Sequence, residues 1–110
     1  MKSRKHARYL VEYCASFSGE QLKASGVILD LSSNGCRARS ANRSNIGQSL
    51  AVLIDVPRYE APLYVSRAIV RWSKGQEFGV EFLHMGSADE QRLDQLMREM
   101  SADTALRIHE

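Results

Sequence analysis

Two extended segments joined by a tight turn stand out in residues 63–84, LYVSRAIVRWSKGQEFGVEFLH. Residues 63–73 alternate in character, which is typical of a strand with two different faces. One face is predicted to hold Tyr64, Ala68, Val70 and Trp72, and the other Leu63, Val65, Ile69 and Arg71. Residues 77–84 alternate more regularly, with an apolar face made of Phe78, Val80, Phe82 and His84. Lys74-Gly75-Gln76 lies between the segments as a turn, so the stretch predicts an antiparallel hairpin.

Four more strands are predicted before this hairpin. Aromatic and branched residues fill the first one, which ends at the turn Ser18-Gly19-Glu20. In the next strand Val27, Leu29 and Leu31 are expected on one face, and Ile28, Asp30 and Ser32 on the other. It ends at Asn34-Gly35, a dipeptide that tolerates the positive φ angles of tight turns. The four predicted strands are residues 9–17, 22–33, 36–39 and 48–56.

The pattern changes period after residue 86. Ser87-Ala88-Asp89-Glu90 has the form of a helix capping box, and apolar residues then recur at helical spacing. The predicted fold is therefore mainly β: a six-stranded antiparallel β-barrel with a C-terminal α-helix. We expect one domain, with a flexible basic arm at residues 1–8, the barrel at 9–86, and the helix and tail at 87–110.

Composition is that of an ordinary globular domain, because 44% of the 110 residues are hydrophobic and 25% are charged. No apolar run is long enough to cross a bilayer and no signal peptide is evident, so a cytoplasmic location is expected. The two cysteines and three histidines show no metal-ligand spacing. Residues 1–43 hold eight Lys/Arg against three acids, which favours an anionic ligand near this half or else a solvated basic tail.

Asp30, Ser32 and Gly35 form a DxSxxG motif at the end of the second predicted strand. Residues two apart in a strand share a face, so the carboxylate and the hydroxyl can meet one ligand. A carboxylate can accept hydrogen bonds from the two parallel donors, N1–H and N2–H₂, on the edge of guanine. Gly35 lets the backbone approach closely. The alternative is a local turn in which Asp30 and Ser32 bond only nearby amides.

Arg4 and Arg8 form an RxxxR motif in the basic N-terminal segment. Their spacing allows both to reach one ligand, whether the segment is extended or helical. The planar guanidinium pairs with phosphate oxygens and with O6 and N7 of guanine. Taken singly, this motif is equally consistent with a solvated tail.

RxxxR followed about twenty residues later by DxSxxG resembles the PilZ domain family, bacterial receptors for the second messenger cyclic di-GMP. The resemblance spans about residues 4–100. It extends to two later segments, which are similar to the family's last strands: Ile69-Val70-Arg71-Trp72 and Phe78-Gly79-Val80-Glu81-Phe82.

The resemblance implies that Arg4 and Arg8 bind guanine and phosphate, and that Asp30, Ser32 and Gly35 hold the other side of a guanine. Further contacts are expected from Lys5, Arg37 and Trp72, with a surface arginine and a core or rim tryptophan as the alternatives. Ser3 precedes the first motif arginine, at a position that in this family influences ligand stoichiometry. With serine at this position, binding of one ligand molecule and binding of an intercalated pair are both consistent with the sequence.

The implied function is a stand-alone cyclic di-GMP receptor that uses no cofactor and relays the signal to an unidentified effector protein through ordering of its N-terminal arm. The alternative is a PilZ-like adaptor that binds no nucleotide and acts only through protein contacts. Binding of DNA or RNA is not expected, because the basic residues cluster in one arm and not along an aromatic groove. Enzymatic activity is not expected either, since no phosphate loop or nucleophile–base set is present. A homodimer through the C-terminal helix stays open.

Overall fold

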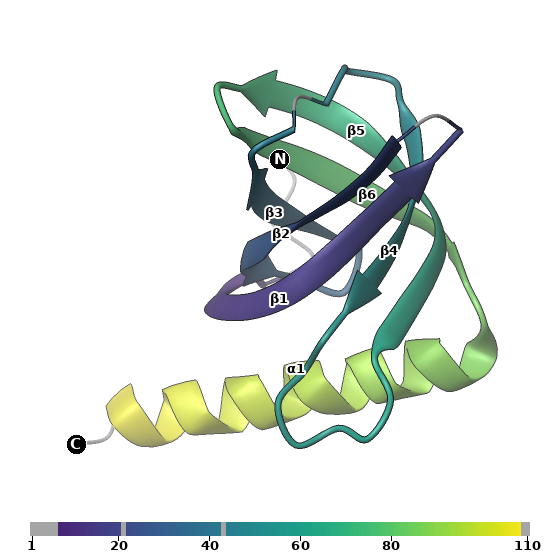
Figure 1. The fold of residues 1–110 in the computed structure, drawn as a ribbon. Coiled ribbons are helices and arrows are strands. Elements are labelled where there is room, and N and C mark those ends of the chain that lie inside the picture. Colours follow the sequence, from purple (N-terminus) through teal and green to yellow (C-terminus); the bar gives the residue numbers. More distant parts are fainter. Residues whose placement is uncertain (1–6, 21, 43, 109–110) are drawn as a thin grey trace, which may run out of the picture.

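The computed structural model describes residues 7–20, 22–42 and 44–108, and within these ranges the chain forms six strands and one helix (Figure 1). Ser3, Arg4 and Lys5 lie outside the described residues. The elements are β1 (Tyr9–Gly19), β2 (Leu22–Leu31), β3 (Gly35–Ser40), β4 (Ser49–Ile54), β5 (Leu63–Lys74), β6 (Glu77–Met85) and α1 (Ser87–Ile108). The predicted six-stranded antiparallel barrel with a C-terminal helix is confirmed.

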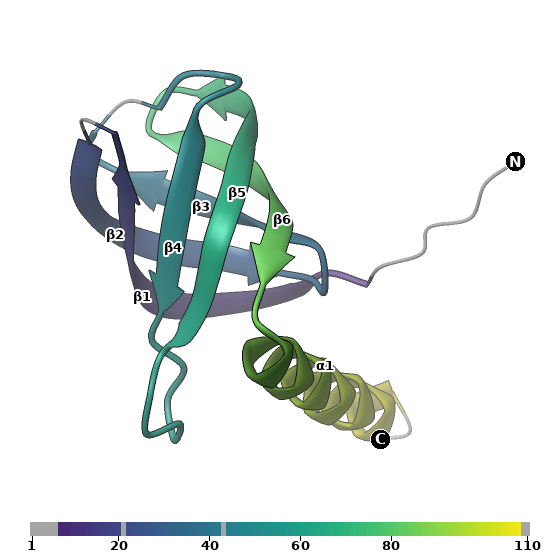
Figure 2. The same ribbon diagram turned by 90° about the vertical axis from the view of Figure 1, so that its right-hand side faces the viewer.

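The strands close the barrel in the order β1-β2-β3-β6-β5-β4. β1 completes the closure, because it pairs with β2 along most of its length and with β4 only through residues 15–18. The pairing of β3 with β6 joins the early part of the chain to the last hairpin. As a result, the turn between β2 and β3 lies beside β6, although more than forty residues separate them in sequence (Figure 2).

The barrel interior is filled by apolar side chains from all six strands. The rings of Phe17 and Phe78 meet edge to face there, with 5.3 Å between their centroids. Cys36 is part of the same core, and burial raises the pKa of its thiol to about 12, with the charge of Asp30 as a smaller contribution. This thiol is therefore protonated at neutral pH.

Two predicted strand faces are wrong because β-bulges shift the alternation. In β5, Leu63 and Val65 lie in the core together with Ala68 and Val70, since the register slips around Arg67. A second irregularity separates Val70 from Trp72, which is exposed and not on the buried face. The alternation read from sequence assumes an uninterrupted strand, and one extra residue reverses it.

β2 shows the same effect. Ile28 and Leu31 are both fully buried although they stand three residues apart, because the pairing with β3 shifts between Ile28 and Asp30. Leu31 and Ile28 were predicted on opposite faces, but both lie in the core, whereas Leu29 is only partly buried. The expected apolar position of His84 is also wrong: His84 is exposed near the end of β6, where its Nδ1 lies 2.8 Å from Ser66 Oγ.

α1 lies across one end of the barrel (Figure 1), and its buried Leu93 and Leu96 complete the core there. Its first hydrogen bond runs from the Glu90 amide to the Gly86 carbonyl, at 2.9 Å, so Gly86 occupies the capping position predicted for Ser87. The loop between β4 and β5 holds the helix, because the Arg92 guanidinium stacks over the Tyr59 ring, 5.0 Å from its centroid. Over the described part of the chain, no helix has both the length and the apolarity needed to span a membrane.

Candidate ligand-binding site

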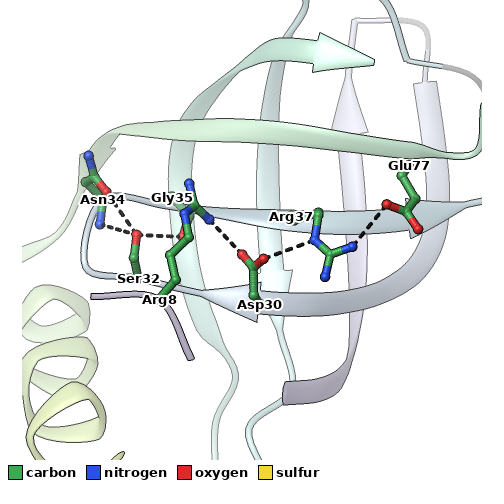
Figure 3. Close-up of polar contacts among 7 residues, drawn as sticks. All are labelled: Arg8, Asp30, Ser32, Asn34, Gly35, Arg37 and Glu77. Carbon is green, nitrogen blue, oxygen red and sulfur yellow. Dashed lines mark hydrogen bonds and ion pairs between the residues drawn. The ribbon is translucent and has the colours of Figure 1, made fainter. Parts of the chain in front are cut away.

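Asp30 is the centre of a chain of ion pairs that connects the two sequence motifs (Figure 3). Arg8 Nη1 lies 2.6 Å from Asp30 Oδ1, and Arg37 Nε lies 3.0 Å from Asp30 Oδ2. Arg37 Nη1 continues the chain to Glu77 Oε1, at 3.1 Å. The Asp30 side chain is only 12% exposed, so this carboxylate is partly desolvated and strongly oriented by its two partners.

Strand pairing explains why these residues meet. Asp30 is the register partner of Leu10 on β1 and of Arg37 on β3. Arg8 comes two residues before Leu10, so its side chain enters from the start of β1. Side chains on directly paired residues lie within contact distance, which places a carboxylate between two guanidiniums. The fold therefore brings one residue from each sequence motif, Arg8 and Asp30, into direct contact.

Ser32 takes part in the turn between β2 and β3. It is buried, and its hydroxyl donates to Asn34 Oδ1 at 2.9 Å and to the Gly35 carbonyl at 3.2 Å, while it accepts from the Asn34 amide at 3.3 Å. The Ser32 amide also donates to the Gly35 carbonyl, at 2.9 Å. For Ser32 these are the local bonds of the turn alternative, whereas Asp30 binds long-range partners.

Of the two reasons that the sequence offers for Gly35, positive φ and close approach of the backbone, the structure shows the second, and the approach is to β6. Neither Asn34 nor Gly35 is among the described residues with positive φ, so the turn needs no left-handed glycine. A Cβ built on Gly35 would instead collide with the carbonyl oxygen of Val80 on β6. The glycine therefore allows β3 to approach β6 closely enough to close the barrel.

A surface hollow of about 320 Å³ adjoins this turn. Trp72 forms part of its wall and is 39% exposed. The indole lies over Gly79, where any Cβ would collide with the ring, so this glycine makes room for the tryptophan. Asp30 is not among the described lining residues, but its carboxylate binds Arg8, which is one of them. The lining residues are Arg8, Asn34, Gly35, Arg71, Trp72, Gly79, Val80 and Glu81.

Several site residues were not singled out from the sequence. Arg71 and Glu81 face each other across β5 and β6, with Arg71 Nη2 2.7 Å from Glu81 Oε1, and Glu77 holds Arg37. The predicted hairpin turn at residues 74–76 already implied that Glu77 and Glu81 stand opposite β5, which was the available signal. Arg37 differs from its assignment as a phosphate contact, since its guanidinium is directed at Asp30 and Glu77.

The electrostatics of the hollow favour an anion. Hydrogen bonds to Asp30 and then to Glu77 raise the pKa of Arg37, so this cation stays charged at any physiological pH. Arg37 is not among the described lining residues; Arg8 and Arg71 place two guanidiniums in the wall, and Glu81 is the single acid among those residues. A larger hollow, of about 720 Å³, lies beside residues 18–20 and 48–51, but its described lining residues include Glu20 and no arginine or lysine.

These features define a class of small closed antiparallel barrels that carry an arginine-lined hollow beside the turn between the second and third strands. The family model for the PilZ domain matches residues 2–99, so the chain belongs to the PilZ domain family. Among curated proteins no match is found.

Solved structures give a similar fold, with matches to 14 chains. One of these is the Bacillus subtilis inhibitor of motility MotI/DgrA, which superposes with a TM-score of 0.77 at 19% sequence identity. The alignment covers 94% of this chain and 53% of that protein, so the chain spans about half the length of this neighbour. At this identity the likeness concerns the fold.

Proposed function

We propose that this protein is a cytoplasmic receptor for cyclic di-GMP that relays binding to a partner protein. Family membership supports the ligand class, and one geometric observation carries the proposal. Arg8 and Asp30, which come from the two motifs, form a 2.6 Å ion pair at the edge of the hollow. In this proposal Asp30 accepts the N1–H and N2–H₂ donors of guanine, while Arg8 binds O6 and N7 or a phosphate.

Trp72 and Gly35 support the proposal from the other walls. The exposed indole offers a flat surface against which a base can stack, and the turn at Gly35 contributes backbone without a side chain. Arg4 and Lys5 precede Arg8 by four and three residues, so the same short segment would bring them over the ligand. We propose that closure of this segment over the nucleotide creates the surface that the partner reads.

The ion pairs of Asp30 also favour a second candidate. Both carboxylate oxygens are bonded, to Arg8 and to Arg37, and such a network can serve to fix the barrel surface of an adaptor that binds no nucleotide. The two candidates differ in one property: only the receptor binds cyclic di-GMP.

Calorimetric titration of the whole chain separates them. For the receptor we expect a dissociation constant in the micromolar range or tighter for cyclic di-GMP. Cyclic di-AMP should bind far more weakly, because adenine presents the N1 lone pair to Asp30 where guanine presents a donor. A folded protein that gives no heat of binding with cyclic di-GMP at high concentration would support the adaptor and contradict the receptor.

A further inference from the structure

The guanidinium of Arg37 is divided between two acids. Its Nε donates to Asp30 Oδ2 at 3.0 Å, and its Nη1 donates to Glu77 Oε1 at 3.1 Å. An arginine that meets a single carboxylate prefers to bind both oxygens with two parallel N–H groups. Here Glu77 draws one end of the guanidinium away, so Arg37 contacts only one of the Asp30 oxygens.

The strand register gives this arrangement its shape. Arg37 stands directly opposite Gly79 on β6, and Arg39 stands opposite Glu77. Because Gly79 has no side chain, the Arg37 guanidinium meets no side chain from its direct partner and reaches the diagonal residue Glu77. The side chains of Asp30, Arg37 and Glu77 thus lie in a row across the neighbouring strands β2, β3 and β6, as Figure 3 shows.

We propose that Glu77 is a positioning residue for guanine recognition: by holding Arg37, it orients the Asp30 carboxylate and keeps Oδ1 directed at Arg8, which lines the hollow. This inference rests on the proposed function. Without Glu77, the Arg37 guanidinium can turn onto both oxygens of Asp30 and compete with the guanine edge for them.

The direction of the change in cyclic di-GMP affinity distinguishes positioning by Glu77 from a simple effect of its negative charge. Cyclic di-GMP is an anion, so removal of any nearby acid should strengthen its binding through long-range attraction. If Glu77 positions Asp30 through Arg37, removal of the Glu77 charge should instead weaken binding. Glu12 is the control, because it is an exposed acid on a strand, β1, and is not among the described residues that line the hollow.

The test is calorimetric titration of cyclic di-GMP into wild type, Glu77→Gln, Glu12→Gln, Arg37→Gln and the Glu77→Gln/Arg37→Gln double variant, with melting temperatures measured alongside. We expect Glu77→Gln to weaken binding about tenfold, the scale of one charge-assisted hydrogen bond. Glu12→Gln should bind as tightly as wild type or more tightly. In the Arg37→Gln background, Glu77→Gln should have no further effect, since Glu77 acts only through Arg37.

Two outcomes would overturn the inference. These are equal affinity of Glu77→Gln and Glu12→Gln, and a tenfold loss that persists in the Arg37→Gln background. If Glu77→Gln does not fold, Arg37→Lys replaces it as the test variant. Lysine lacks the planar guanidinium that contacts Asp30 and Glu77 with separate nitrogens, so tenfold weaker binding is expected. Wild-type affinity of Arg37→Lys would contradict the inference. Absence of binding by wild type would instead overturn the proposed function.

Discussion

Arg8→Ala is expected to weaken cyclic di-GMP binding by about 100-fold or more, the scale of two charge-assisted hydrogen bonds. Arg8 is the described residue that both contacts Asp30, at 2.6 Å, and lines the hollow. Its side chain is half exposed, so the guanidinium is accessible to a ligand while Asp30 holds it in place. Alanine removes the guanidinium and its ion pair with Asp30. The negative charge of Asp30 is then balanced less fully, so it repels the phosphates of the ligand.

The measurement is calorimetric titration, with Arg98→Ala as the control. Arg98 is an exposed arginine on α1, so this variant removes the same charge and should bind within about twofold of wild type. Arg8→Lys should recover only part of the affinity, because an ammonium is a point charge without the planar fork. Equal affinity of Arg8→Ala and Arg98→Ala would contradict the assignment of Arg8.

Asp30→Ala is expected to remove selectivity for guanine as well as affinity. Asp30 is the acceptor that distinguishes guanine from adenine in the proposed site, and one bidentate pair of this kind contributes about 1–3 kcal/mol of discrimination. Loss of the carboxylate also leaves Arg8 without this partner and Arg37 paired with Glu77 alone, which raises the local positive charge. We therefore expect cyclic di-GMP to bind at least tenfold more weakly, and cyclic di-AMP to bind with nearly the same residual affinity.

Competition between the two nucleotides measures this directly. Asp94→Ala, at an exposed acid of α1, serves as the charge control and should keep the preference for guanine. A melting temperature for Asp30→Ala close to that of wild type shows that the barrel is intact. If Asp30→Ala still prefers cyclic di-GMP to the wild-type extent, another residue recognises the base.

The order of elements could be predicted because it depends on local patterns. Period-two alternation, turn signals and the change to helical spacing at Ser87 identified all six strands and the helix, with boundaries that differ by a few residues. The faces of β2 and β5 could not be predicted, because bulges arise from pairing between distant strands. For the same reason His84 was expected on the apolar face and is exposed.

The site shows the same division. Arg8 and Asp30 stand in recognisable motifs, so their association was predictable from the family resemblance. Glu77 and Arg37 have no motif of this kind: their contact depends on the β3–β6 register and on the missing side chain of Gly79. Trp72 was a candidate on chemistry alone, and its place over Gly79 follows from pairing that only the folded barrel creates.

The central claim is that cyclic di-GMP binds in the hollow between Arg8 and Trp72. A two-dimensional ¹⁵N–¹H NMR titration tests it most directly, because Gly35, Gly79 and the protein's single tryptophan line the hollow, and each gives a signal from its backbone amide or indole N–H. We expect these three signals to shift most strongly and to saturate together as cyclic di-GMP is added. Unchanged signals there, or shifts confined to the loop and helix around Tyr59 and Arg92, would contradict the claim.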